Sequence, residues 1–226
     1  MKILTISGLV AALTFIAAFL FTPSPVAVES SAMDVPETSS PMAADVRFQL
    51  DPARSKFIVH ANRAGLAWFK GKSHWIGVKD FSGEASMSLD SVSPASLTMT
   101  IRAASLEETR PVFTDDQKKI INKELNEIVL ETAKYPDITF KSTDITGKIK
   151  NGAFDVRVSG DITLHGVTRH ITIPAIVTVN GDTFDAKGKF KLNRKKFGVK
   201  ATEAFHGFVR VRHTLIFDFD IIGQKV

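Results

Sequence analysis

Residues 160–174 read Gly-Asp-Ile-Thr-Leu-His-Gly-Val-Thr-Arg-His-Ile-Thr-Ile-Pro, and the alternation within them decides the fold. Apolar and polar residues alternate up to Leu164, and the alternation resumes from Ile171 after the glycine at position 166. A period of two is typical of a strand with one buried face and one solvent-facing face. The stretch therefore predicts two antiparallel strands joined by a turn at Gly166, with His165 on the solvent-facing side.

The alternation extends in both directions, over a meander from Ala153 to Asn193. Asn180-Gly181-Asp182 predicts a second turn, because Asn-Gly readily takes the positive φ angles of a tight hairpin. Three successive strands of the meander then share one apolar face, and the rest of the chain must cover that face.

The same pattern predicts strands on both sides of the meander, at residues 47–50, 55–62, 75–80, 81–89, 97–103, 137–149 and 208–223. Asp51-Pro52 is expected to break the first two from each other. No spacing typical of βαβ units occurs, so the chain is predicted to be all-β and antiparallel. Strands this long favour closure into an eight-stranded barrel, which removes exposed sheet edges.

One helix is predicted, from Asp115 to Glu131, with Thr114 or Asp115 as its cap. Its apolar stripe consists of Ile120, Ile121, Leu125, Ile128 and Val129. We expect this helix to cover one end of the barrel as a lid.

Composition limits the possible functions. The 226 residues are 44% hydrophobic, and the formal net charge of +5 is too small to indicate nucleic-acid binding. The absence of cysteine excludes disulfides, thiolate catalysis and zinc–thiolate sites.

The N-terminus predicts export. Residues 1–22 combine Lys2 with an uncharged apolar run, which is typical of a signal peptide or an N-terminal membrane anchor. Residues 23–45 are rich in Pro and Ser and are expected to form a flexible linker, and residues 46–226 the barrel domain. We expect a periplasmic protein, with possible membrane association through residues 3–21. The oligomeric state is left open.

No catalytic motif is present: there is no Gly-x-Ser-x-Gly turn, phosphate-binding glycine loop or His-Glu-x-x-His helix. We expect no enzyme activity, no cofactor and no metal. The alternatives are a small-metabolite enzyme of the cell envelope, with His60 or His165 as its base, and a membrane-tethered accessory subunit. Arg169 and the basic run from Lys187 to Lys200 either bind an anionic group or pair with acidic neighbours and solvent.

Seventeen phenylalanines lie largely on the inward faces of the predicted strands. They could fill a solid core, or they could line a deep apolar lumen. Periodicity does not distinguish the two.

Several motifs resemble one known family. The stretch from Gly160 to Ile173, with its Gly-x-Ile-Thr-x-His-Gly-Val-Thr-Arg core, is similar to the most characteristic segment of the YceI family. Residues 50–55 (Leu-Asp-Pro-x-x-Ser), 134–143 (Lys-Tyr-Pro-x-Ile-Thr-Phe-Lys-Ser-Thr) and 193–199 (Asn-Arg-x-x-Phe-Gly-Val) agree in the right order. Residues 57–72 depart from the commonest pattern of the family. In this segment the chain resembles a divergent branch of the family.

The resemblance implies an exported, lipocalin-like barrel that holds a polyisoprenoid or other long-chain lipid in its lumen. The residues that it implies as the lipid-binding wall are the inward ones of the matching strands: Phe57, Val59, Phe140, Val156, Val158, Ile162, Ile171, Ile173, Phe190, Leu215, Phe217 and Phe219.

Gly166 is expected to need a positive φ angle, which costs a side chain about 1 kcal/mol or more. From the sequence we expect Gly166→Val to lower stability clearly in a denaturant melt. His165→Ala, at a residue assigned to the outer face, is expected to have little effect on folding.

Overall fold

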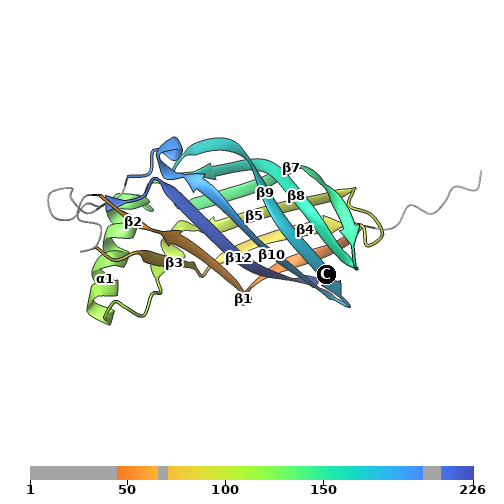
Figure 1. The fold of residues 1–226 in the computed structure, drawn as a ribbon, viewed down its shortest axis with the longest axis horizontal. Helices are drawn as coiled ribbons and strands as arrows, with labels where there is room; N and C mark the ends of the chain where they lie inside the picture. The colour runs from red at the N-terminus through yellow and green to blue at the C-terminus, as the bar shows by residue number, and fades with distance from the viewer. Residues whose placement is uncertain (1–44, 66–70, 201–209) are drawn as a thin grey trace, which may run out of the picture. The chain divides into compact units, whose positions relative to one another are not determined.

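The structure is a computed structural model that describes residues 45–65, 71–200 and 210–226 (Figure 1). The predicted signal peptide or anchor and almost all of the predicted linker lie outside the described residues. Within the described part of the chain, no helix is long and apolar enough to cross a membrane.

The described residues are mostly strands, in agreement with the sequence. The strands are β1 (Val46–Ala61), β2 (Arg63–Ala64), β3 (His74–Val78), β4 (Phe81–Met87), β5 (Ala95–Arg102), β6 (Leu106–Glu108), β7 (Asp137–Lys150), β8 (Ala153–Leu164), β9 (Val167–Asn180), β10 (Thr183–Asn193), β11 (Arg210–Val211) and β12 (Thr214–Lys225). The helical segments are η2 (Ala103–Ser105), α1 (Asp115–Glu124), η3 (Leu125–Val129) and η4 (Arg194–Phe197).

Among the described residues, eight strands close into an antiparallel barrel in the order β12-β10-β9-β8-β7-β5-β4-β1. Pairing of β1 with β12 completes the circle, with Phe57 opposite Phe219 and Val59 opposite Phe217. The short strands β3 and β6 extend the sheet beside the second half of β1. The predicted eight-stranded barrel is therefore confirmed.

The first strand is continuous, so the predicted break at Asp51-Pro52 is wrong. β1 runs from Val46 to Ala61, and its register against β12 shifts between Asp51 and Lys56. Asp51 Oδ1 accepts hydrogen bonds from the main-chain N–H groups of Ala53 and Arg54, at 3.0 and 3.2 Å. Ser55 Oγ donates to the Asp51 carbonyl at 2.6 Å and accepts from the Ile222 N–H at 2.9 Å. These side chains satisfy the main-chain groups that a bulge leaves unpaired, and the strand bends without ending.

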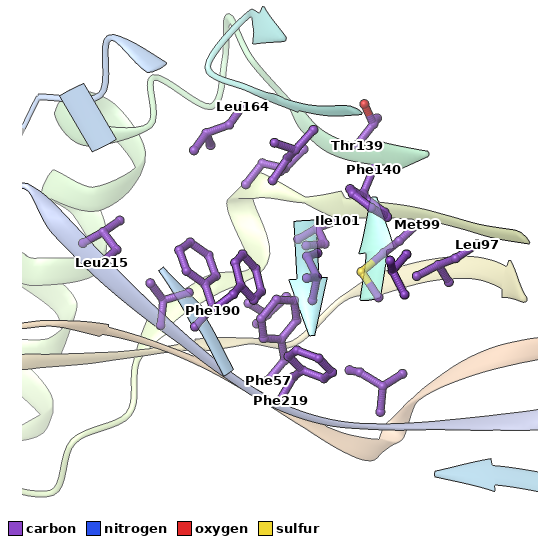
Figure 2. Close-up of a pocket in the computed structure, with 18 of the residues that line it drawn as sticks. Phe57, Leu97, Met99, Ile101, Thr139, Phe140, Leu164, Phe190, Leu215 and Phe219 are labelled. Atoms are coloured by element: carbon purple, nitrogen blue, oxygen red, sulfur yellow. The ribbon is translucent and has the colours of Figure 1, made fainter. Parts of the chain in front are cut away.

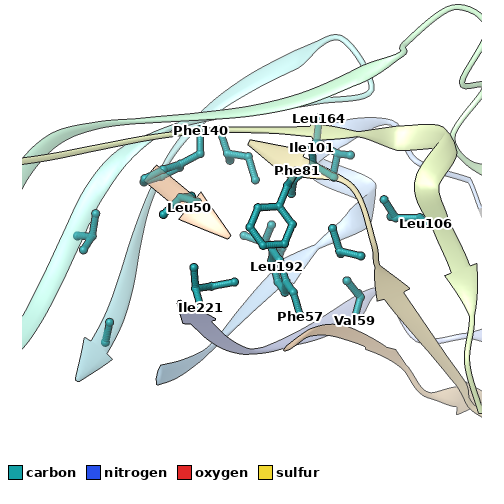
Figure 3. Close-up of a cluster of buried hydrophobic side chains, with 14 of the residues drawn as sticks. Leu50, Phe57, Val59, Phe81, Ile101, Leu106, Phe140, Leu164, Leu192 and Ile221 are labelled. Carbon is teal, nitrogen blue, oxygen red and sulfur yellow. The ribbon is translucent and has the colours of Figure 1, made fainter. Parts of the chain in front are cut away.

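The alternating apolar residues point into the barrel, as the sequence predicted. In β8, Phe154, Val156 and Val158 are buried, whereas the intervening Asp155 and Arg157 are exposed. Other buried side chains lie along the inner wall, among them Phe81 at 3% exposure (Figure 3). The core is thus the inner surface of the barrel.

The predicted helix is shorter and its apolar stripe narrower than the sequence indicated. Thr114 caps α1 through reciprocal hydrogen bonds with Gln117, and the α-helix ends at Glu124, followed by the π-helical turn η3. Ile120 and Ile128 are 63% and 51% exposed. Each lies one position before a residue of the inward-facing i, i+4 series Ile121, Leu125 and Val129, and one position turns a helix by about 100°.

The turn at Gly166 is present, but His165 lies within the turn and not at the end of the preceding strand as predicted. His165 and Gly166 have φ angles of 53° and 73°, so both occupy the centre of the two-residue turn between β8 and β9. His165 Nε2 lies 2.7 Å from Glu131 Oε2, and the centroid of the histidine ring lies 4.2 Å from the centroid of the Tyr135 ring. The side chain is only 9% exposed. His165 is therefore a partly buried turn residue and not an outward strand residue.

Gly166 is expected to tolerate a side chain less well than Gly152, which lies at φ 75° in the turn between β7 and β8. A Cβ atom at Gly166 would come 2.6 Å from Tyr135, whereas nothing lies within 4 Å of one at Gly152. We expect Gly152→Ala to cost about 1–2 kcal/mol for the φ angle alone, and Gly166→Ala to cost clearly more. Denaturant melts of the two variants measure the difference, and equal losses would show that the contact with Tyr135 is unimportant.

His165→Ala is expected to destabilise the barrel, contrary to the expectation from sequence. Loss of a hydrogen bond to a carboxylate costs about 1–3 kcal/mol. Glu131→Gln keeps an acceptor beside His165 and is expected to cost less in the same melt. An unchanged midpoint for His165→Ala would restore the earlier expectation.

Candidate functional site

The barrel encloses a cavity of about 310 Å³, lined almost entirely by apolar side chains (Figure 2). This volume lies at the lower end of the range typical of small-molecule sites, about 300–1000 Å³. The wall includes residues of all eight barrel strands, of β3 and β6, and of the helical segment that covers one end.

The inward side chains are not packed against one another across the barrel. Ile173, Phe190 and Phe217 point inward but keep intermediate exposure, because they face the cavity. Of the two possibilities that the sequence left open, the structure therefore shows an apolar lumen and not a solid core.

Eleven of the twelve residues predicted to bind lipid line this cavity: Phe57, Val59, Phe140, Val156, Val158, Ile162, Ile173, Phe190, Leu215, Phe217 and Phe219. Ile171 does not line it. Ile171 is partly buried and packs against the core cluster. Contact of these residues with a lipid stays a prediction.

Four of the predicted phenylalanines form one aromatic cluster on the wall. The rings of Phe190 and Phe217 stack with 4.7 Å between their centroids. The ring centroid of Phe57 lies 6.2 Å from that of Phe219 and 6.3 Å from that of Phe217. Figure 2 shows Phe57, Phe190 and Phe219 together in the lumen. Such a cluster offers aromatic faces and edges to an apolar guest.

Two glycines let aromatic rings lie close against the wall. A Cβ atom at Gly188 would come 2.5 Å from the ring of Phe219, and one at Gly223 would come 2.1 Å from the ring of Phe184. Because these rings occupy the space of absent side chains, they take less room at the centre of the barrel.

Part of the wall was not predicted as site. Leu97, Met99 and Ile101 of β5 line the cavity, and so do Ile121 and Leu125 of the helical segment. Their alternation and helical spacing were visible in the sequence. The sequence did not reveal that β5 pairs with β7, nor that the helix lies over the end of the barrel.

Neither histidine suggested for the enzyme alternative lines the lumen. His60 lies 3.9 Å from Asp218, and His165 is held in its turn by Glu131. His74, which was not predicted as a site residue, does line the cavity, and its Nδ1 lies 2.7 Å from Glu108 Oε2.

The carboxylate of Glu108 is fully buried. Its Oε1 accepts hydrogen bonds from the main-chain N–H groups of Trp75 and Arg110, at 3.1 and 2.9 Å. Burial raises the pKa of this carboxyl, but the hydrogen bonds from His74, Arg110 and Trp75 outweigh burial and hold the pKa below its usual value. Glu108 is therefore ionised at neutral pH.

Part of the basic run is paired within the fold. Lys187 pairs with Asp185 and Asp220, and Lys189 lies 2.9 Å from Asp218. Arg194 is buried and donates to the carbonyl of Val199 at 2.9 Å.

Arg169 donates from Nε to the Lys196 carbonyl at 2.6 Å and not to an acidic side chain. No group of three or more metal-binding side chains occurs in the described ranges.

The fold and the apolar lumen agree with one protein family. The model of the YceI-like domain matches residues 48–221, which is most of the chain. The chain belongs to the YceI-like family.

Protein YceI of Escherichia coli O6:H1 is 29% identical over 171 residues, 71% of this chain and 79% of its own length. Among solved structures, BcnA of Burkholderia cenocepacia superposes with a TM-score of 0.61 at 22% identity, covering 76% of this chain and 98% of its own. A polyisoprenoid binding domain from Saccharophagus degradans superposes with a TM-score of 0.57 at 14% identity, covering 79% and 98%. At these identities the structural neighbours show the fold.

The ionised Glu108 is expected to make stability depend on pH in the acid range. Its lowered pKa adds stability above the pKa of an unfolded glutamate, about 4.3. That stability is lost as the pH falls through the lower pKa of the folded state. We expect Glu108→Gln to lower the free energy of unfolding by about 1–2 kcal/mol at pH 7. This loss should become progressively smaller below about pH 4.

Glu107→Gln is the matched control, because Glu107 is half exposed and pairs with Lys79 at the surface. Its cost should stay small at every pH. A cost of Glu108→Gln that does not change between pH 7 and pH 3 would contradict the assignment of an ionised, buried carboxylate.

Proposed function

We propose that this YceI-like barrel is a carrier that holds a polyisoprenoid or another long-chain lipid in its lumen. The observation that carries the proposal is the open, almost wholly apolar cavity inside the barrel. A guest that fills such a space must itself be apolar over most of its surface, because a polar group there would lose its hydration without a partner.

The energetics favour a long chain. Burial of apolar surface contributes about 25 cal/mol per Å², so each additional apolar segment that enters the lumen adds affinity without a charged contact. The aromatic cluster of Phe57, Phe190, Phe217 and Phe219 adds polarizable contacts along the path. The structural neighbour from Saccharophagus degradans, which is described as a polyisoprenoid binding domain, supports the same class of ligand.

We further propose that the barrel is not an enzyme and that it acts after export to the periplasm. The apolar wall, and the position of His60 and His165 away from it, support a binding role. Export is supported by the charged and apolar sequence of residues 1–22, through which the protein would be secreted or anchored.

Native mass spectrometry of the protein purified from cells tests the lipid proposal. We expect an adduct with the mass of a long-chain lipid, released by organic extraction. Ala175→Phe, on the inner wall, is expected to reduce the adduct because the larger side chain enters the lumen. The protein should still fold, at a cost of about 1–3 kcal/mol for overpacking.

Ile176→Phe is the matched control. Ile176 is the next residue of β9, is 46% exposed and points away from the lumen. The proposal predicts an undiminished adduct for this variant. Absence of any adduct from the parent protein, or equal loss in both variants, would contradict it.

A further inference from the structure

The lumen is chemically polarised along its length. Its wall includes four ionisable side chains, namely His74, Glu124, Arg194 and Lys200. They belong to the start of β3, to α1 and to the segment that follows β10, and these elements gather at the end of the barrel that α1 covers (Figure 1). The other polar side chains of the wall are Ser86, Ser96 and Thr139. A lipid in the lumen would therefore place its polar head at the α1 end.

The ring of His74, one of the wall residues at this end, is held by two neighbouring side chains. It stacks on Phe113 with 5.2 Å between ring centroids and 8° between ring planes. Its Nδ1 is held by Glu108 Oε2 at 2.7 Å. Glu108 is not part of the cavity wall, so the ring of His74 separates this carboxylate from the lumen.

The surroundings of Glu108 determine which nitrogen of His74 carries the proton. Oε1 of Glu108 already accepts from the N–H groups of Trp75 and Arg110, and the ionised Oε2 also requires a donor. The proton of a neutral His74 ring is therefore on Nδ1. This leaves Nε2 as a hydrogen-bond acceptor. Nε2 has no protein partner among residues 45–65, 71–200 and 210–226.

The other ionisable wall residues do not build a site for a charged head. Arg194 is buried, and it directs its donors to the main-chain carbonyls of Val199 and Val211. Glu124 and Lys200 carry opposite formal charges, so together they add no net charge to this end of the lumen. An uncharged head that donates a hydrogen bond suits these surroundings better than a phosphate or a carboxylate.

We propose that His74 is the head-group anchor of the lumen, and that its Nε2 accepts a hydrogen bond from the hydroxyl of a long-chain isoprenoid alcohol or phenol. This inference rests on the proposed lipid-binding function and adds the class of head group. His74 contacts the ligand directly, whereas Glu108 is a positioning residue that fixes the tautomer.

Binding of geranylgeraniol and of its methyl ether tests the proposal, because the two share one chain and only the alcohol can donate. We expect the parent protein to bind the alcohol roughly fivefold more tightly than the ether, as one neutral hydrogen bond provides. In His74→Phe, which keeps a ring on Phe113, both probes should bind with the affinity of the ether. His60→Phe, at a histidine off the cavity wall, should keep the fivefold preference.

Glu108→Gln gives a second, independent test. The two main-chain N–H groups hold the amide oxygen at the Oε1 position, so the amide NH₂ turns toward His74 and donates to Nδ1. The ring proton then moves to Nε2, which becomes a donor that both an alcohol and an ether can accept. We expect the preference for the alcohol to fall toward unity. Nitrogen-15 shifts of the imidazole should report the proton on Nδ1 in the parent and on Nε2 in Glu108→Gln.

The outcomes separate this inference from the function on which it rests. Equal affinities of the parent for the alcohol and the ether would overturn the anchor while leaving the lipid carrier intact. A preference that persists in His74→Phe, or a parent ring with its proton on Nε2, would overturn it as well. Failure of both probes to bind the parent would overturn the carrier function, and the anchor with it. If His74→Phe does not fold, Glu108→Gln and the nitrogen-15 shifts decide.

Discussion

Closure of the sheet between its first and last strands is the constraint on which the rest of the structure depends. β1 and β12 pair over most of their lengths, although they lie at opposite ends of the described chain. This pairing satisfies the two sheet edges that an open eight-stranded sheet would expose. It also brings Phe57 and Val59 beside Phe219 and Phe217, which assembles one side of the lumen. The bulge built by Asp51 and Ser55 lets β1 bend, so that its two halves pair with β4 and β3 while its other edge stays on β12.

The lumen stays open because the large side chains lie along the wall. Phe184 and Phe219 rest on glycines of neighbouring strands, where a Cβ atom would overlap their rings. Protein interiors are otherwise packed as densely as organic crystals, and an empty space forfeits dispersion contacts. An unfilled apolar cavity is thus a cost to the isolated barrel, and a bound apolar chain would offset that cost. The same feature that weakens the packing creates the proposed binding site.

The ionisable side chains of the lumen wall gather at the end that α1 covers, and the buried carboxylate beside them has partners. This is the carboxylate of Glu108: it is fully buried, and it is held by two main-chain N–H groups and a histidine. The main-chain N–H of Glu108 donates to Asn122 Oδ1 at 2.7 Å, which ties α1 to β6. The helix that covers the lumen, the buried carboxylate and the histidine of the wall therefore form one connected unit. A polar head and an apolar tail are the two halves of a ligand that such a lumen can accommodate together.

The sequence by itself determined the strands, the faces that they bury and most of the lumen wall, because strand alternation is a local property with a period of two. Eleven of the twelve predicted wall residues line the cavity for this reason. Asp51-Pro52 and His165 were misjudged, because a bulge and a turn contact depend on partners distant in the sequence, Ile222 and Glu131. Whether the inward side chains meet or leave a space depends on the diameter of the closed barrel, which no single strand encodes. The His74–Glu108 pair joins residues 34 positions apart, and only the pairing of β3 with β6 brings them together. The tertiary structure alone therefore decided that the lumen is open and that its polar end carries an oriented histidine.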